Sequence, residues 1–65
     1  MRTTAEIFAD MVPAELALRK AVRSGEDATA LAERYSDLCI EYREAGRAEH
    51  FAAVVETMSR EARDD

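Results

Sequence analysis

The sequence predicts an all-α protein, a small bundle of three to four helices with a C-terminal antiparallel αα-hairpin. Three observations lead to this prediction. Apolar residues recur at helical steps of three and four through most of the chain. No stretch alternates apolar and polar residues as a half-buried strand does. Finally, Gly46 separates two clean apolar stripes, which must cover each other or a partner to leave water.

The length of 65 residues predicts a single domain, residues 1–65, with a marginal core. The hydrophobic fraction is 48%, but the aromatic residues are only two Phe and two Tyr, and there is no Trp. Each fully buried Leu or Phe stabilises a fold by about 1.5–3 kcal/mol before conformational entropy is subtracted. We therefore expect a homodimer or a complex with another protein to supply the missing burial.

The first helix is predicted to span residues 4–12. Thr3 and Glu6 have the spacing of a capping box, in which each side chain satisfies a backbone amide of the other residue. Glu6 near the helix start also suits the positive end of the helix dipole.

Pro13 is predicted to break this helix and to begin a second one at residues 13–24. A proline inside a helix costs about 3 kcal/mol, whereas at the first helical position its missing N–H costs nothing. Gly25, just beyond, is typical of a helix end. The alternative is one continuous helix, which would carry two apolar stripes, one through Ile7 and Met11 and another through Phe8 and Val12.

Two longer helices, at residues 28–45 and 48–63, are predicted to form the αα-hairpin. The first carries a stripe of Leu31, Tyr35, Leu38, Tyr42 and Ala45, and the second a stripe of Phe51, Val54, Val55, Met58 and Ala62. If the chain folds back at Gly46, the Tyr35/Leu38/Tyr42 face packs on Phe51, Val55 and Met58. Leu18 and Val22 would complete that core.

Leu38, Tyr42 and Gly46, followed by a second amphipathic helix, resemble the helical hairpin of a tetratricopeptide repeat, which would imply a protein-binding scaffold. The resemblance covers residues 31–62. Phe51 stands where the repeat has a small alanine, and one repeat is too few to bury a solenoid core. We therefore interpret the segment as a generic αα-hairpin and assign no family.

The net charge of −5 argues against nucleic-acid binding, which needs a basic surface. No apolar run is long enough to span a membrane, so we expect no membrane association and a cytoplasmic protein. Eight arginines against one lysine, with abundant alanine, indicate a GC-rich genome, bacterial or phage.

The sequence offers little for catalysis, so we expect no enzyme, no cofactor, no metal and no small-molecule substrate. His50 is the only histidine, and it lacks neighbours at the spacing of a helical metal site. Cys39 is the only cysteine and is interpreted as a small buried hydrophobe. Two glycines, Gly25 and Gly46, cannot form a phosphate-binding loop.

Two surfaces are predicted to bind a partner. Phe8, Val12 and Leu16 are left over once the core stripe of the N-terminal half is satisfied. Ile40 projects into a ridge of acidic residues, which would suit an apolar pocket rimmed by arginine. The ridge consists of Glu33, Asp37, Glu41 and Glu44.

These patterns favour a noncatalytic protein–protein interaction module, a small regulator or adaptor that binds, inhibits or positions a larger protein and also self-associates. Two alternatives remain open. One is a small nucleic-acid-associated transcriptional regulator acting through Arg19, Lys20 and Arg23, with a helix-turn-helix at residues 4–24. The other is an acidic inhibitor or mimic aimed at a basic site.

Overall fold

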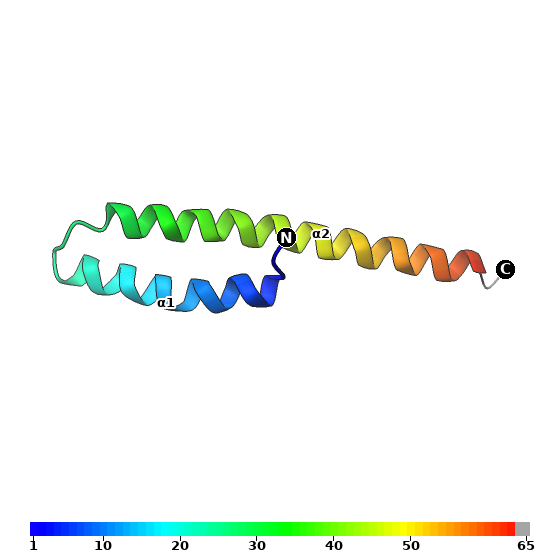
Figure 1. Ribbon diagram of the computed structural model, residues 1–65, viewed down its shortest axis with the longest axis horizontal. Helices are drawn as coiled ribbons and strands as arrows, with labels where there is room; N and C mark the ends of the chain where they lie inside the picture. The colour runs from blue at the N-terminus through cyan, green and yellow to red at the C-terminus, as the bar shows by residue number, and fades with distance from the viewer. Residues whose placement is uncertain (64–65) are drawn as a thin grey trace.

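The protein is an extended helical hairpin with a long single-helix extension. The computed structural model describes residues 1–63, and two helices, α1 at Thr4–Arg23 and α2 at Thr29–Arg63, account for nearly all of them. α1 lies antiparallel to the first part of α2, and the rest of α2 continues past the N-terminus of α1 (Figure 1). The molecule measures 62 × 15 × 14 Å. The prediction of a bundle of three to four helices is therefore wrong.

α1 begins where the sequence predicts. The Thr3 hydroxyl accepts a hydrogen bond from the Glu6 amide at 3.2 Å, and the Glu6 carboxylate accepts one from the Thr3 amide at 3.1 Å. Both halves of the capping box are therefore present. This arrangement satisfies two backbone amides at the end of the hairpin where the chain enters the fold.

The predicted break at Pro13 does not occur, because α1 runs unbroken from Thr4 to Arg23. Pro13 is exposed and lies about 120° around the helix from buried Ile7. The carbonyl that loses its amide partner therefore faces water, which can hydrogen-bond it. Continuity also keeps Ala14 and Ala21 on the same buried face as Ile7, and this burial offsets the cost of the proline.

A tight turn joins the two helices. Gly25 has φ 72°, in the left-handed region that glycine adopts without strain. The Gly25 amide donates to the Val22 carbonyl, and the Glu26 amide donates to the Ala21 carbonyl, which together form a Schellman motif. Asp27 then accepts hydrogen bonds from the Thr29 amide and hydroxyl at 3.0 and 2.7 Å. These bonds lower the pKa of Asp27 and begin α2.

The second predicted break, at Gly46, is also absent. α2 is one helix of 35 residues, and Gly46 lies inside it with no positive φ. The glycine instead lies beside the start of α1: a methyl group added to it would be 3.9 Å from Thr4 Cγ2. A helix tolerates one glycine at a cost of about 1 kcal/mol, so Gly46 alone does not force a turn. The likeness to a tetratricopeptide hairpin therefore does not extend to its turn.

The core lies between α1 and the first half of α2. Its buried residues are Ile7 and Ala14 from α1 and Leu38 and Ala45 from α2. Two partly buried side chains, Met11 and Tyr35, pack against them. Small residues on both helices let the backbones approach closely, which leaves room for few large side chains.

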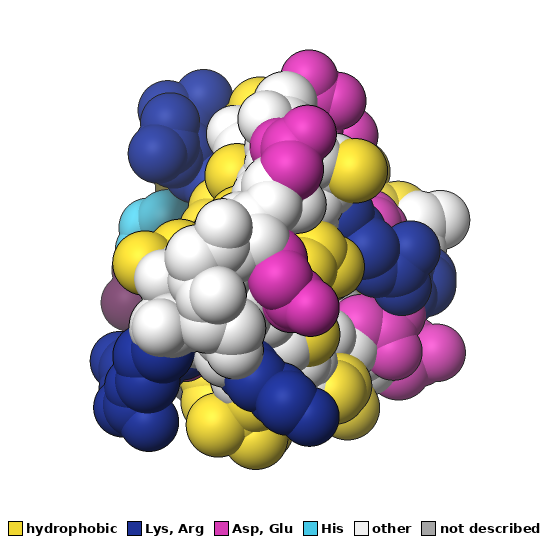
Figure 2. Space-filling view, turned by 90° about the vertical axis from the view of Figure 1, so that its left-hand side faces the viewer, with side chains coloured by type: hydrophobic (Ala, Val, Ile, Leu, Met, Phe, Trp, Pro, Cys, Tyr) yellow, Lys and Arg dark blue, Asp and Glu magenta, His cyan; other side chains and the backbone are white. Residues whose placement is uncertain are grey.

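The predicted packing of Tyr35, Leu38 and Tyr42 on the last helical segment is wrong. Because α2 does not fold back, the stripe of Phe51, Val55 and Met58 remains exposed. Val22 is also exposed and does not complete the core, whereas Leu18 is partly buried. Figure 2, viewed end-on from the turn, shows apolar side chains reaching the surface between charged ones.

Candidate interaction surfaces

The C-terminal half of α2 is a free-standing helix, which we call the arm and define as residues 47–63. Every residue of the arm is exposed. It extends beyond the N-terminus of α1, so α1 does not lie alongside most of its length (Figure 1). An isolated helix of about this length is only marginally stable in water, since most helical stability comes from packing an apolar face.

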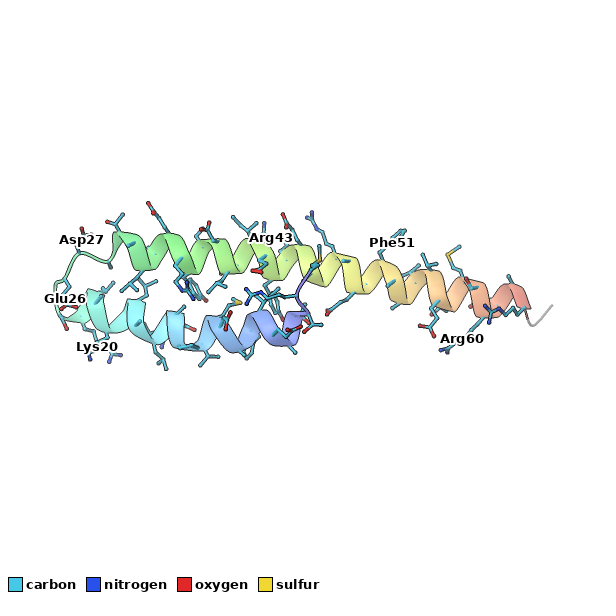
Figure 3. All side chains as sticks on the ribbon, viewed as in Figure 1. Lys20, Glu26, Asp27, Arg43, Phe51 and Arg60 are labelled. Atoms are coloured by element: carbon cyan, nitrogen blue, oxygen red, sulfur yellow. The ribbon has the colours of Figure 1, made fainter. Side chains whose placement is uncertain are left out.

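The arm carries its own apolar face, the outer stripe. Its members are Phe51, Val54, Val55, Met58 and Ala62. At 100° per residue, Phe51 lies about 140° around α2 from Leu38, and Met58 about 140° from Ala45. The outer stripe therefore points away from the side of α2 that holds α1. Figure 3 shows this directly, with Phe51 and Arg43 projecting on the side opposite α1.

The outer stripe presents large apolar side chains to solvent. Phe51 is 70% exposed and Met58 63%, while Val54 and Val55 are each less than half exposed. Together they leave roughly 400 Å² of apolar side-chain surface in contact with water, as large as the biggest patch on a typical monomeric protein. A shallow groove beside the stripe is lined by His50, Val54 and Glu61, among others.

The two ends of the outer stripe carry opposite charge. Ile40, Arg47, Val54 and Glu61 follow each other at steps of seven residues, so they lie on nearly one line along α2. Arg43, Glu44 and Arg47 precede the apolar residues, and Glu61 follows them. Glu44 lies within about 20° of Phe51 around the helix, whereas Arg43, Arg47 and Glu61 lie on the other flank of the stripe. Ile40, half exposed, lies on this same outer face on the other side of the two arginines.

The predicted surface of Phe8, Val12 and Leu16 lies on the hairpin, residues 4–46, and we call it the hairpin patch. All three side chains are exposed, and Val12 and Leu16 lie at least about 140° around α1 from buried Ile7 and Ala14. The Phe8 ring lies 6.5 Å from that of Tyr42, at an interplanar angle of 51°. The hairpin patch is therefore separate from the outer stripe and lies on a different element.

The predicted acidic ridge divides into two parts. Glu33, Asp37 and Glu44 are exposed, as is Ile40. Glu41 is instead partly buried against the N-terminal segment, where Arg2 engages it. Three of the four predicted carboxylates thus accompany Ile40, while the fourth holds the hairpin together.

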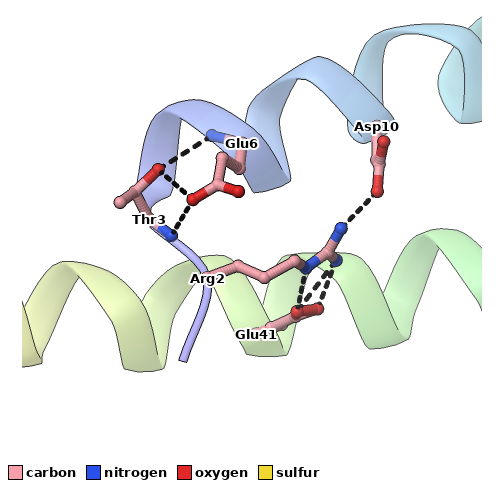
Figure 4. Close-up of polar contacts among 5 residues, drawn as sticks. All are labelled: Arg2, Thr3, Glu6, Asp10 and Glu41. Atoms are coloured by element: carbon pink, nitrogen blue, oxygen red, sulfur yellow. Dashed lines mark hydrogen bonds and ion pairs between the residues drawn. The ribbon is translucent and has the colours of Figure 1, made fainter.

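Arg2 ties the N-terminal segment to both helices (Figure 4). Its Nε donates to Glu41 Oε2 at 3.0 Å and its Nη2 to Glu41 Oε1 at 2.5 Å, a bidentate pair, and its Nη1 pairs with Asp10. Hydrogen bonds from Arg2 lower the pKa of Glu41, and the same bonds raise the pKa of Arg2. The sequence reasoning missed this pair, because a separation of 39 residues leaves no local signal.

A second contact fixes the base of the arm. Glu49 accepts hydrogen bonds from the Thr4 amide at 3.1 Å and from the Thr4 hydroxyl at 2.8 Å. Its carboxylate therefore lies at the N-terminus of α1, the positive end of that helix dipole. Glu49 lies in the first turn of the arm, so this contact ties the base of the arm to the start of α1.

The remaining sequence candidates are not members of either apolar surface, although His50 lines the groove beside the outer stripe. Arg19, Lys20 and Arg23 are exposed near the end of α1, and Arg19 pairs with Glu15 at 2.7 Å. His50 is exposed on the arm, and Cys39 is partly buried rather than fully buried.

Within residues 1–63, no group of three or more His, Cys, Asp or Glu side chains is arranged to hold a metal ion. Neither helix over the same residues has an apolar stretch long enough to cross a membrane.

Comparisons with protein-family models, with curated proteins and with solved structures find no match to this chain.

Proposed function

We propose that this chain is a noncatalytic protein-interaction module, a small regulator or adaptor that binds another protein chain through the outer stripe of its arm. The observation that carries the proposal is an arm exposed at every residue, with Phe51 and Met58 more than 60% exposed on one face. Water around such a face is unfavourable, and a partner that covers it gains about 25 cal/mol per Å² of apolar surface.

The geometry also supports the direction of approach. Glu49 and Glu56 lie on the side of the arm that corresponds to the α1-facing side of the hairpin. A partner helix placed there, in line with α1, would meet these two carboxylates. The side of α2 opposite α1 instead presents the apolar residues of the outer stripe to a partner. Nothing from the hairpin obstructs that side (Figure 3).

Photo-crosslinking in the cells that express this chain tests the proposal. Phe51 is replaced by the photoreactive residue p-benzoylphenylalanine, and Ala53 is replaced in a matched control. Both positions lie on the arm and are exposed, but Ala53 lies about 160° around the helix from Phe51. We expect a discrete protein adduct, identified by mass spectrometry, at position 51 and none at position 53. Equal or absent adducts at the two positions would contradict the proposal.

A further inference from the structure

From the charge and spacing of the outer stripe, we infer that the partner covering it is a second copy of this chain, bound with its arm antiparallel to the first. This inference rests on the proposed function and adds the identity and orientation of the partner.

Charge selects the antiparallel orientation. In a parallel pair, Arg47 would face Arg47 of the other copy and Glu61 would face Glu61, and like charges at such positions are destabilising. In an antiparallel pair, the N-terminal end of one outer stripe lies beside the C-terminal end of the other. Glu61 of each copy then lies at the level between Arg43 and Arg47 of the other copy and on the same flank, so opposite charges are adjacent at both ends of the interface. Glu44 lies on the other flank, opposite Ala62 of the other copy.

The sizes of the apolar residues fit the same register. If the two-fold axis passes at the level of Ala53, Phe51 lies opposite Val55 of the other copy, and Met58 lies opposite Ala48. Large side chains thus meet smaller ones, which allows two helices to interdigitate. The position of the two-fold axis that suits the charge pairing and the position that suits the apolar pairing differ by no more than about one residue.

The shape of the molecule permits this contact. α1 lies on the opposite side of α2, so a second arm can lie along the outer stripe without meeting α1 of either copy. Pairing over about 16 helical residues buries roughly 1,000 Å² in total, the lower limit for a specific protein interface. Since each protomer is 62 Å long, overlap of the arms alone gives a dimer about 100 Å long.

Sedimentation of the purified chain across a concentration series is the first test. We expect a dimer that Phe51→Glu weakens by at least about 30-fold, because a buried aromatic anchor is replaced by a charge. The matched control, Ala53→Glu, adds the same charge to the opposite side of the arm and should leave the dimer intact. A monomer at all concentrations, or equal weakening by both variants, would overturn the inference.

Charge reversal tests the orientation. Arg47→Glu and Glu61→Arg should each weaken the dimer, and the two together should restore it, since the pair is then exchanged across the interface. In a parallel dimer the combination would restore nothing, because like charges would still face each other. Absence of rescue would therefore overturn the antiparallel arrangement.

Disulfide formation tests the register, in a Cys39→Ser background. The Ala48→Cys variant mixed with the Met58→Cys variant should form a mixed disulfide on oxidation. Neither variant should crosslink to itself, because the two like positions would lie about 15 Å apart along the axis. Self-crosslinking of each variant without the mixed product would overturn the register.

These results separate the inference from the proposed function. A different protein crosslinked at position 51, together with a monomeric purified chain, would remove the homodimer and keep the interaction module. A compact dimer, measured by small-angle scattering at about 62 Å rather than about 100 Å, would place the contact on the hairpin instead of the arm.

Discussion

The hairpin and the arm share helix α2 but bury their residues in opposite ways. In the hairpin, Ala45 is 1% exposed, whereas in the arm the much larger and more apolar Phe51 is 70% exposed. Hydrophobicity alone therefore does not decide burial in this molecule. What decides it is whether another helix lies against that side of α2.

The two halves also differ in the direction of their apolar faces. The stripe through Leu38 and Ala45 faces α1, and the outer stripe through Phe51 and Met58 lies about 140° around the helix from it. The first half of α2 therefore has an apolar face that packs on α1, and the second half has an apolar face that points away from α1. Because the faces are separate, each can be changed without disturbing the other.

The largest expected effect is on the hairpin core. Ile7→Ala should lower the free energy of unfolding by about 2–5 kcal/mol, because it empties a fully buried site. Phe51→Ala removes more side-chain volume from the arm and should change the stability of the monomer by less than about 0.5 kcal/mol. Chemical denaturation followed by circular dichroism, at a concentration where the chain is monomeric, measures both. Equal losses would show that the arm residue is also core.

The next largest change in stability is expected on replacing Pro13. Pro13→Ala should stabilise the hairpin by about 1–3 kcal/mol, because alanine restores the missing helical hydrogen bond at a position inside continuous α1. The same denaturation experiment measures the gain. If a helix instead began at Pro13, the substitution would be neutral or destabilising, and the continuity of α1 would be contradicted.

A smaller gain is expected at the junction of hairpin and arm. Gly46→Ala should stabilise α2 by about 0.5–1 kcal/mol, because alanine has the higher helix propensity and its methyl group would only make ordinary contact with Thr4. The matched Gly25→Ala variant should destabilise, because Gly25 has positive φ. A loss of stability in both variants would indicate a turn at Gly46.

The local features of the fold could be predicted from the sequence. The capping box at Thr3 and Glu6 and the helix end before Gly25 are short-range patterns with a direct physical cause, and the structure contains both. The all-α class follows from the periodicity, since nothing in the described chain is a strand.

The topology could not be predicted, because at both Pro13 and Gly46 the free-energy cost of continuing the helix is close to the free energy gained by burial. A proline or a glycine inside a helix costs about 3 and 1 kcal/mol, and only the burial gained elsewhere decides whether the helix continues. At Pro13 that burial comes from Ala14 and Ala21 packing in register with Ile7. At Gly46, the two apolar stripes are compatible with a turn and equally with one straight helix that has two faces.

Phe8, Val12, Leu16 and Ile40 are exposed, and their role as contact residues stays a prediction. The outer stripe was assigned to the core, because its periodicity is the same whether α1, a second hairpin helix or another chain covers it. Periodicity identifies an apolar face and does not identify what lies against it.

The smallest expected effect is the loss of hairpin stability at acidic pH. The pKa of Glu41 is lowered by hydrogen bonds from Arg2, and that of Glu6 is lowered by hydrogen bonds from Thr3. Unfolding restores their ordinary pKa values, so the unfolded chain binds more protons, and the stability that these groups contribute is complete above about pH 4.3. It is lost as the pH falls through their lowered folded-state pKa values. The hairpin should therefore lose stability in acid.

Denaturation of the Glu41→Gln variant at a series of pH values checks this expectation. The variant should be less stable than the wild type at neutral pH, and the difference should shrink in acid, where Glu41 is protonated in both states. Arg2→Gln should behave alike, because it removes the other partner of the same pair. A constant difference across the series would mean that the ion pair does not join the N-terminal segment to α2. The arm contains neither residue, so its contact with a partner should not depend on Glu41 or Arg2.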